Sequence, residues 1–403
     1  MQSPTRFQPT NADEIADFLR DRPHPVYVLG GGSKSAFGRP LRDDESVLDL
    51  SAIAGITLYQ PDELVLTAWA GTKISDIAAV VAERGQCLAF EPPEFGALFG
   101  NDCRSTLGGT VASGWSGPRR FKAGAIRDHL LGALAVGGDG KHFKSGGRVV
   151  KNVTGFDLPK LLAGSHGTLA VMTEITIKLI PSPEVSHTII ATGLDSPTAI
   201  RLLSDLLGGP FEISGAAHLP EAAARRSAVV PVSRSGTSAT LIRLEGFGPS
   251  VADRLRTLEM RFARDIQYLS LDPQEGACVW REIRDVAPLV DPAHIVWRIS
   301  LPAADAAGTV SAIAQATSAE AFYDWGGGLV WLAMPSKDEA HAELVRSLLP
   351  SGHATLMRAP VACRAKTQIF NFLPPALAAL QRRVKSAFDP AGILSPGRLS
   401  LES

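Results

Sequence analysis

The chain has 403 residues, a formal net charge of −1, 45% hydrophobic residues and 20% charged residues, which is the balance of a globular protein with room for two domains. This charge excludes the basic footprint of a nucleic-acid-binding protein, and no stretch reaches the ~18 consecutive apolar residues of a membrane helix. The four cysteines (Cys87, Cys103, Cys278 and Cys363) lack CxxC spacing, which argues against a zinc or iron–sulfur site built by this chain and indicates reduced thiols.

The first half of the chain mixes strands and helices without regular alternation. The acidic N-terminal segment has no apolar core, which excludes a signal peptide. The patterns predict helices at Asn11–Arg20 and Lys73–Arg84 and strands at Val26–Leu29, Ser46–Leu50, Leu64–Ala70, Ala133–Val136 and Leu169–Leu179. This order favours an α+β fold.

A boundary is predicted at Pro181-Ser182-Pro183, where two prolines follow a long strand. Beyond it the patterns predict a second α+β domain, with a mobile loop within Pro220–Ser238. Its expected strands are Thr240–Leu244, His294–Leu301 and Leu329–Ala333, and the expected helices are Val251–Ala263, Glu339–Leu349 and Pro375–Phe388. The predicted domains are therefore 1–182, 183–374 and a tail, 375–403, that returns to the first domain.

A glycine cluster follows the first buried strand and is a candidate phosphate loop. Its candidate residues are Gly30, Gly31, Gly32, Ser33 and Lys34. Asp49 stands near the spacing of a ribose-binding acid in a Rossmann fold, but the residues after Gly32 lack helical spacing, which weakens that interpretation. A P-loop lacks its Gly-Lys-Ser/Thr context, and a purely structural turn stays open for this cluster taken alone.

A second glycine cluster is more informative because basic residues follow it. The segment from Thr106 to Gly114 contains Gly108, Gly109 and Ser113, and Arg119, Arg120, Lys122 and Arg127 come next. Glycines let main-chain amides approach a phosphate. Each cation alone is more simply a solvated charge, but together with the glycines they favour an anionic ligand.

The order of these motifs resembles the FAD-binding fold of the vanillyl-alcohol oxidase family, also called the PCMH type. The matching segments are Gly30–Lys34, Thr106–Gly109, Gly147–Leu158 and Gly164–Leu169. The resemblance implies a PCMH-type FAD-binding domain of two α+β subdomains and a C-terminal α+β cap. His166 stands where the family usually has Glu. Ser33 and Lys34 stand where members with covalent flavin often have His, so the FAD is expected to be noncovalent.

The same resemblance implies the cofactor contacts. The amides of Gly31, Gly32, Ser33, Gly108 and Gly109 are expected at the pyrophosphate. The flavin ring or the adenine is expected to meet Gly164, Ser165 and the Ile175 backbone. Lys151, with Asn152 beside it, is expected either near the pyrimidine end of the flavin or on the surface.

Further segments, among them FEPPEFG, VWRISLP and FDPAGILSPGRL, are similar to the GlcE-type family of FAD-binding subunits of bacterial glycolate oxidase. Catalytic 2-hydroxy-acid dehydrogenases of this fold carry His-rich segments that supply a metal and a base. The comparable positions here read Asp324-Trp325-Gly326-Gly327-Gly328. We therefore expect an electron-transfer subunit without catalytic or metal-ligating residues of its own.

The implied partners are a homologous catalytic FAD subunit that oxidises glycolate to glyoxylate and an iron–sulfur subunit. The implied location is cytoplasmic, with peripheral association to the inner membrane through partners left open. The residues considered for contact with these partners are Trp325, Trp331, Arg119 and Arg120, because aromatic residues and arginine are enriched at interfaces.

Two alternatives remain at this point. One is an autonomous FAD-dependent 2-hydroxy-acid dehydrogenase in which Arg298 pairs with the substrate carboxylate, assisted by Tyr323, Asp324, Trp325 and His353. The other is a structural subunit that has lost its flavin.

Overall fold

The computed structural model describes residues 5–21, 24–148, 156–263 and 265–399. The chain folds into two compact units. Unit 1 comprises Met1–Ser116, Gly124–Ser182 and Phe372–Ser403, and unit 2 comprises Gly117–Ala123 and Pro183–Asn371. The segment 117–123, which the sequence analysis placed in the first domain, therefore belongs to unit 2, and the returning tail starts at Phe372.

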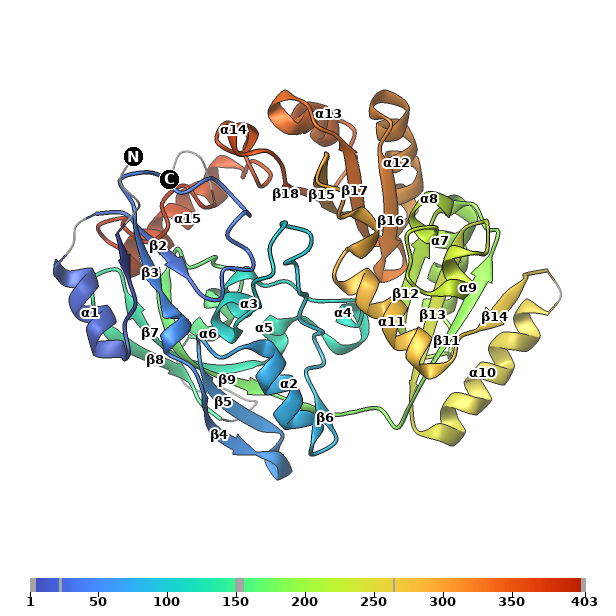
Figure 1. Ribbon diagram of the computed structural model, residues 1–403, viewed down its shortest axis with the longest axis horizontal. Coiled ribbons are helices and arrows are strands. Elements are labelled where there is room, and N and C mark those ends of the chain that lie inside the picture. Colours follow the sequence, from blue (N-terminus) through green and yellow to red (C-terminus); the bar gives the residue numbers. More distant parts are fainter. Residues whose placement is uncertain (1–4, 22–23, 149–155, 264, 400–403) are drawn as a thin grey trace. The chain divides into compact units, whose positions relative to one another are not determined.

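The described residues of unit 1 form three sheets (Figure 1). A parallel sheet has the order β1-β3-β2, and an antiparallel sheet has the order β4-β5-β9-β7-β8. β6 and β10 form a short antiparallel pair. The strands are β1 (Arg6–Phe7), β2 (Val26–Leu29), β3 (Ser46–Asp49), β4 (Ile56–Gln60), β5 (Val65–Trp69), β6 (Gln86–Cys87), β7 (Leu130–Gly137), β8 (His142–Gly146), β9 (Ala170–Lys178) and β10 (Ile180–Pro181).

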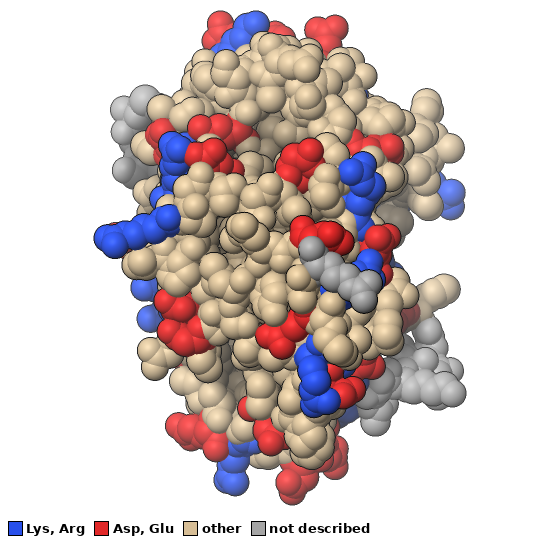
Figure 2. Space-filling view, turned by 90° about the vertical axis from the view of Figure 1, so that its right-hand side faces the viewer, with Lys and Arg blue, Asp and Glu red and all other residues tan. Residues whose placement is uncertain are grey.

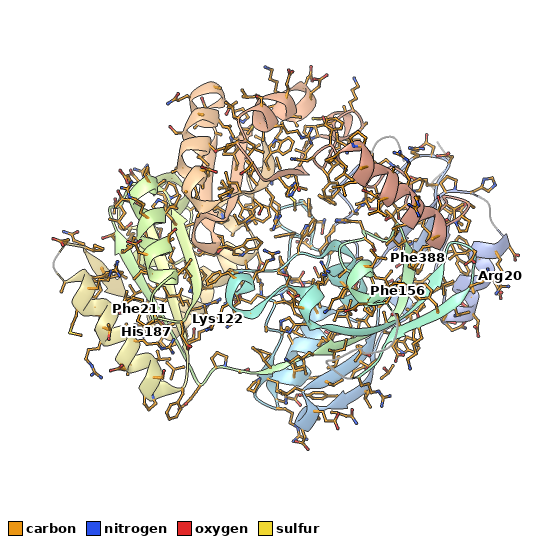
Figure 3. The ribbon with its side chains drawn as sticks, turned by 180° about the vertical axis from the view of Figure 1, so that it is seen from behind. Arg20, Lys122, Phe156, His187, Phe211 and Phe388 are labelled. Carbon is orange, nitrogen blue, oxygen red and sulfur yellow. The ribbon has the colours of Figure 1, made fainter. Side chains whose placement is uncertain are left out.

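The helices of unit 1 cover these sheets. They are α1 (Ala12–Asp21), α2 (Ile74–Ala82), α3 (Leu107–Ser113), α5 (Ile126–His129), α6 (Leu158–Leu162) and α15 (Pro375–Phe388), with 3₁₀ turns η1 (Leu50–Ala52) and η2 (Pro61–Glu63). α1 packs through Ile15 and Leu19 on a core that includes Val26. α15 ends at Phe388 (Figure 3), whose ring lies 5.7 Å from that of Phe143 on β8. The C-terminal helix is thereby fixed to the sheet of unit 1.

Unit 2 is built on one antiparallel sheet with the order β14-β11-β13-β12-β16-β17-β15-β18. The strands are β11 (Val185–Thr192), β12 (Ile213–Leu219), β13 (Ala239–Gly246), β14 (Tyr268–Ser270), β15 (His294–Ser300), β16 (Glu320–Asp324), β17 (Leu329–Pro335) and β18 (His353–Arg358). Part of the core lies between this sheet and α7 and α10, where Leu203, Ile242 and Phe262 are fully buried.

The helices of unit 2 include one from the inserted segment, α4 (Arg120–Ala123), which contacts β12. Lys122 of α4 (Figure 3) pairs with Glu212 at 3.9 Å. The other helices and 3₁₀ turns are α7 (Ser196–Leu207), α8 (Glu221–Ala224), α9 (Val230–Ser233), α10 (Gly248–Phe262), α11 (Pro273–Arg284), η3 (Ala287–Leu289), α12 (Ala303–Thr317), η4 (Trp325–Gly327), η5 (Asp338–His341), α13 (Ala342–Ser347) and α14 (Val361–Arg364).

The α+β class is confirmed, and all of the predicted strands are present. Most of their observed ends lie within one or two residues of the predicted ends. Three expectations change. The segment 220–238 contains α8 and α9, and the helix predicted at 339–349 is split into η5 and α13. The third change concerns the second glycine cluster, whose Gly108 and Gly109 amides were expected at the pyrophosphate and which forms the helix α3.

The surface agrees with the near-zero net charge. On the face drawn in Figure 2, acidic and basic side chains are interspersed over a larger uncharged area. Within the described ranges, no helix combines the length and the apolar character needed to cross a membrane.

Candidate functional site

A pocket in unit 1 lies where three loops and the C-terminal tail meet. It holds about 510 Å³ of space free of protein atoms, part of which is open to solvent. The lining residues are Tyr27, Val28, Leu29, Gly30, Gly31, Gly32, Ser33, Lys34, Ser35, Phe37, Thr106, Gly109, Ala112, Ser113, Trp115, His166 and Arg398. The two glycine clusters, which are more than 70 residues apart, therefore meet at one pocket.

The first glycine loop leaves β2 and presents unused main-chain donors. Among the described residues, no hydrogen-bond acceptor is paired with the amides of Gly31, Gly32 or Ser33. A Cβ atom on Gly31 would overlap the Arg104 carbonyl oxygen, and one on Gly30 would overlap the Thr106 hydroxyl. Glycine is required here because the loop packs directly on the segment before α3.

The second glycine cluster forms a helix because its ends are capped and its apolar side chains are buried. Thr106 Oγ1 accepts from the Gly109 amide at 3.3 Å, and Gly114 ends the helix at φ +70°. Leu107 and Val111 are fully buried in the core. These contacts offset the cost of about 1 kcal/mol for each helical glycine.

Gly108 has a packing role that differs from the predicted one. Its amide donates to the Ala70 carbonyl at 2.8 Å, and a Cβ atom there would lie 2.8 Å from Ala70 Cβ. Gly108 is also absent from the pocket lining. It therefore lets α3 approach β5 closely, and its amide is not directed at a ligand.

The loop after α6 packs on the end of α3. The Gly164 amide donates to the Val111 carbonyl at 3.0 Å, and the His166 amide donates to the Ala112 carbonyl at 2.8 Å. Gly164 takes φ +81° and His166 takes φ +53°. This arrangement places the His166 ring against the Phe37 ring, with 5.3 Å between the centroids.

Besides Gly108, four other described residues that were predicted as cofactor contacts lie outside the lining of the pocket. Ser165 is buried, and its hydroxyl has no hydrogen-bond partner among the described residues. Ile175 lies in β9, paired with Ala68 and Ala133, with its side chain in the core. Gly114 and Gly164 pack on each other and are also outside the lining, and Lys151 and Asn152 fall outside the described residues.

The electrostatics of the pocket favour an anion. Its lining residues, all of them described, include Lys34 and Arg398 and no carboxylate. Lys34 Nζ donates to Ser105 Oγ at 2.8 Å, and burial lowers the pKa of Lys34 to about 8 although Glu94 raises it. Burial and the charges of Arg398 and Lys34 lower the pKa of His166 to about 3, so His166 is neutral at physiological pH.

Arg398 is a charged pocket residue that the sequence analysis did not predict, and Phe37 and Trp115 are aromatic lining residues that it did not predict either. The C-terminal tail runs parallel to β2, where the Val26 amide donates to the Ile393 carbonyl at 2.8 Å and the Ser395 amide donates to the Val26 carbonyl at 2.8 Å. Arg398 then donates to the Tyr27 hydroxyl at 2.7 Å and lies 5.5 Å from the Phe37 ring centroid. Arg398 lies in the segment FDPAGILSPGRL, whose similarity to the GlcE-type family is the signal in the sequence that pointed to this tail.

Asp49, the residue that would bind ribose in a Rossmann fold, has a structural role. Its side chain is fully buried and accepts from Arg6 Nε at 2.9 Å and from the Ser51 amide at 3.0 Å. No helix follows Gly32 between residues 30 and 45, all of which are described. The Rossmann interpretation is therefore wrong.

The alternative substrate residues of unit 2 are only partly brought together. Arg298 and Trp325 are in contact, and Asp324 Oδ1 accepts from the Trp325 amide at 2.7 Å. Tyr323 is buried against His218, and His353 is exposed at the start of β18. Across the described ranges, no group of three or more His, Cys, Asp or Glu side chains has the arrangement of a metal site.

The residues around the pocket of unit 1 fit a ligand with phosphates and a planar ring. Three unused amides and two cations suit the phosphates, and the Phe37 and Trp115 side chains provide flat apolar surface. Gly30 and Gly31 lie close to the segment that precedes α3. At these two positions the first glycine loop therefore presents only main-chain atoms to the pocket.

Comparisons with known proteins agree with this fit. Residues 5–146 match the model of the FAD binding domain family, and residues 364–399 match the C-terminal domain of FAD linked oxidases. The chain is 33% identical to glycolate oxidase subunit GlcE of Escherichia coli K12 over 380 residues, which are 94% of this chain and 93% of that one.

The chain is also similar, at lower coverage or lower identity, to two longer proteins. Over 202 residues the chain is 30% identical to glycolate oxidase subunit GlcD of Bacillus subtilis 168, covering 49% of this chain and 42% of that one. A solved structure of p-cresol methylhydroxylase superposes with a TM-score of 0.73 at 12% identity, covering 99% of this chain and 89% of that one. The second likeness shows the PCMH-type fold.

Proposed function

Because this chain belongs to the GlcE family of glycolate oxidase subunits, within the PCMH-type FAD-linked oxidoreductases, we propose that it is an electron-transfer subunit of a glycolate oxidase. In this proposal the chain binds FAD noncovalently and oxidises no glycolate by itself. The single observation that carries the FAD part is the meeting of both glycine segments with Lys34 and Arg398 at one pocket.

The proposed diphosphate contacts come from the first glycine loop and from two side chains. The amides of Gly31, Gly32 and Ser33 would donate to phosphate oxygens, and Lys34 and Arg398 would balance the negative charge. The Gly109 amide is already paired with Thr106 in the helix cap, so Gly109 would contribute an open surface and not a donor.

The ring of the cofactor supplies one- and two-electron chemistry when FAD is bound. The chain's own contribution would be to orient the cofactor and exclude water through the buried aromatic side chains of Phe37 and Trp115. His166, being neutral, would add a hydrogen-bonding side chain without adding charge.

The absence of independent glycolate oxidation is proposed from the residues of unit 2. The segment comparable to the His-rich segment of catalytic relatives begins with Asp324, whose carboxylate accepts from the Trp325 amide. The Tyr323 ring packs against the His218 ring, and His353 is exposed at the start of β18, so neither is assigned as the group that takes a substrate proton. A homologous catalytic FAD subunit would perform that step, and an iron–sulfur subunit would take the electrons onward.

The experiment is anaerobic mixing of glycolate with the purified, flavin-loaded chain, followed by the flavin absorbance. We expect the oxidised flavin spectrum to persist in the isolated chain and to bleach when the catalytic partner is added. Bleaching of the isolated chain at an ordinary enzymatic rate would contradict the electron-transfer assignment. A colourless protein with no flavin after cofactor extraction would contradict the FAD assignment.

Affinity purification of the tagged chain from its own cells tests the partners. We expect it to retain a second FAD protein and a protein carrying iron–sulfur clusters. The same preparation, separated into membrane and supernatant fractions, tests whether the assembly associates peripherally with the inner membrane.

A further inference from the structure

Unit 2 contains a tryptophan held in a backbone conformation that is rare for a bulky residue. Trp325 has φ +53° at the end of β16, and it is followed by Gly326 at φ +66° and Gly327 at φ +100°. Its indole Nε1 donates to the Gly117 carbonyl at 3.1 Å, and its amide donates to Asp324. Left-handed backbone at a bulky residue persists where the surroundings fix it, and it is concentrated at functional sites.

Two arginines from different elements lie over the ring of Trp325. The guanidinium carbon of Arg120, on α4, lies 4.6 Å from the ring centroid, and that of Arg298, on β15, lies 5.2 Å from it. Within the described part of the chain, neither guanidinium forms a hydrogen bond or an ion pair closer than 4 Å. Like charges repel, so two cations on one ring are costly without an anion.

Other arginine–tryptophan pairs of unit 2 do not share this property. Arg346 lies 5.5 Å from the Trp297 ring centroid and donates to the Phe370 carbonyl at 3.0 Å. Arg243, 4.6 Å from the Trp280 ring centroid, donates to the Ser214 carbonyl at 3.1 Å. The two guanidinium groups at Trp325 differ from these because their N–H donors have no acceptor among the described residues.

The surroundings of Arg298 show that its charge is not well solvated. Burial and the neighbouring charge of Arg120 lower the pKa of Arg298 to about 10, whereas Asp324 raises it. The cluster carries one unit of positive charge when both arginines and Asp324 are ionised. A monoanion would neutralise it, whereas a dianion such as hydrogen phosphate would leave an excess negative charge.

We propose that Arg298 and Arg120 form a binding site for a small monocarboxylate beside Trp325. The planar guanidinium fork of Arg298 matches a carboxylate, with which it can form two parallel hydrogen bonds. Arg120, whose side chain is exposed, would close over the bound acid from solvent. The site is formed entirely by unit 2 and requires no turnover, so it is independent of the electron-transfer role proposed above.

The test is calorimetric titration of the flavin-loaded chain with glycolate and, separately, with glyoxylate. Glycolamide, which has the shape of glycolate without its charge, is the matched control ligand. We expect both acids to bind and glycolamide not to bind. Absence of acid binding up to about 10 mM, or equal binding of glycolamide, would overturn the proposal.

Variants assign the binding to this cluster. Arg298→Gln and Arg120→Gln are each expected to weaken acid binding by about tenfold or more, because a hydrogen bond to a charged group is lost. Arg225→Gln removes an exposed charge elsewhere in unit 2 and should leave binding unchanged. Unchanged acid binding in both Arg298→Gln and Arg120→Gln would overturn the proposal.

A fluorescence measurement tests the same site without the Arg298 variant, which could lose acid binding because it misfolds. Binding of the acid should change the emission of the native chain and of Arg225→Gln, and Trp325→Phe should remove that change. Arg120→Gln alters only an exposed side chain, so it is expected to keep the native unfolding temperature. A full fluorescence response in Trp325→Phe would place the acid elsewhere and overturn the proposal.

Discussion

Lys34 Nζ lies 2.8 Å from Ser105 Oγ, which joins the loop after β2 to the segment that precedes α3. Lys34 is half-buried, and within the described ranges its ammonium group has no carboxylate within ion-pair distance; Glu94 acts on it only from farther away. A partly buried cation with little compensation destabilises the apoprotein and attracts an anion.

Lys34→Met is therefore expected to raise the unfolding temperature of the apoprotein at pH 7 and to weaken FAD binding about tenfold or more. The pKa of Lys34 is lowered to about 8 from 10.5. The cost of burying the charge is thus fully present below pH 8 and disappears above pH 10.5. FAD affinity of the native chain should fall as the pH rises through 8, and Lys34→Met should flatten that fall.

Thermal unfolding and flavin titration between pH 6 and about 9.5 check this expectation. Lys144→Met, which removes an exposed lysine of β8, is the matched control and should leave both quantities unchanged. Equal FAD affinity in Lys34→Met and the native chain would contradict the placement of the phosphates beside Lys34.

Gly109→Asp is expected to abolish flavin retention. Gly109 lines the pocket, and an added side chain would occupy it with a negative charge beside the proposed diphosphate. Gly109→Ala is the control because a Cβ there lies 3.2 Å from Thr106 Oγ1, a contact that a small shift relieves. The flavin-to-protein absorbance ratio after purification measures both; retention of full flavin in the Asp variant would refute the placement.

Arg398→Met is expected to reduce FAD affinity while the fold persists. The change keeps an apolar stem against Tyr27 and Phe37 but removes a charge from the pocket. The dissociation constant from flavin titration should rise about tenfold or more. Arg398→Lys should restore part of the affinity, and a dissociation constant that is identical in all three proteins would show that the tail does not contact the cofactor.

Asp389→Asn is expected to lower the free energy of unfolding of unit 1 by about 1–3 kcal/mol. The Asp389 side chain is fully buried, and it accepts from the Leu394 amide at 2.7 Å and from Lys385 Nζ at 2.5 Å. Loss of the carboxylate leaves Lys385 without its ion pair and loosens the tail that carries Arg398. Urea unfolding measures the change, with the exposed Asp253→Asn as the control; equal midpoints for both variants would contradict this role.

The regular elements could be predicted where the local pattern is strong. Helix α15 was predicted with its observed bounds, and β9 was predicted within one residue. No helix was predicted at Gly108 and Gly109, because glycine has a low intrinsic helix propensity. Helix α3 forms because Thr106 caps it and because the contact with Ala70 accepts only a glycine, and neither partner can be identified from the local pattern.

By itself the sequence determined that glycine segments follow a buried strand and precede a basic stretch. It also indicated that other atoms approach the main chain closely at these glycines, because the lack of a side chain is a property of the residue itself. Only the tertiary structure decided which distant residues lie beside these glycine segments. It brought Arg398 from the far end of the chain to β2, and it transferred residues 117–123 into unit 2, where Arg120 meets Trp325. These contacts depend on strand pairing and packing between distant segments, whose free energies are set by the assembled core and not by neighbouring residues.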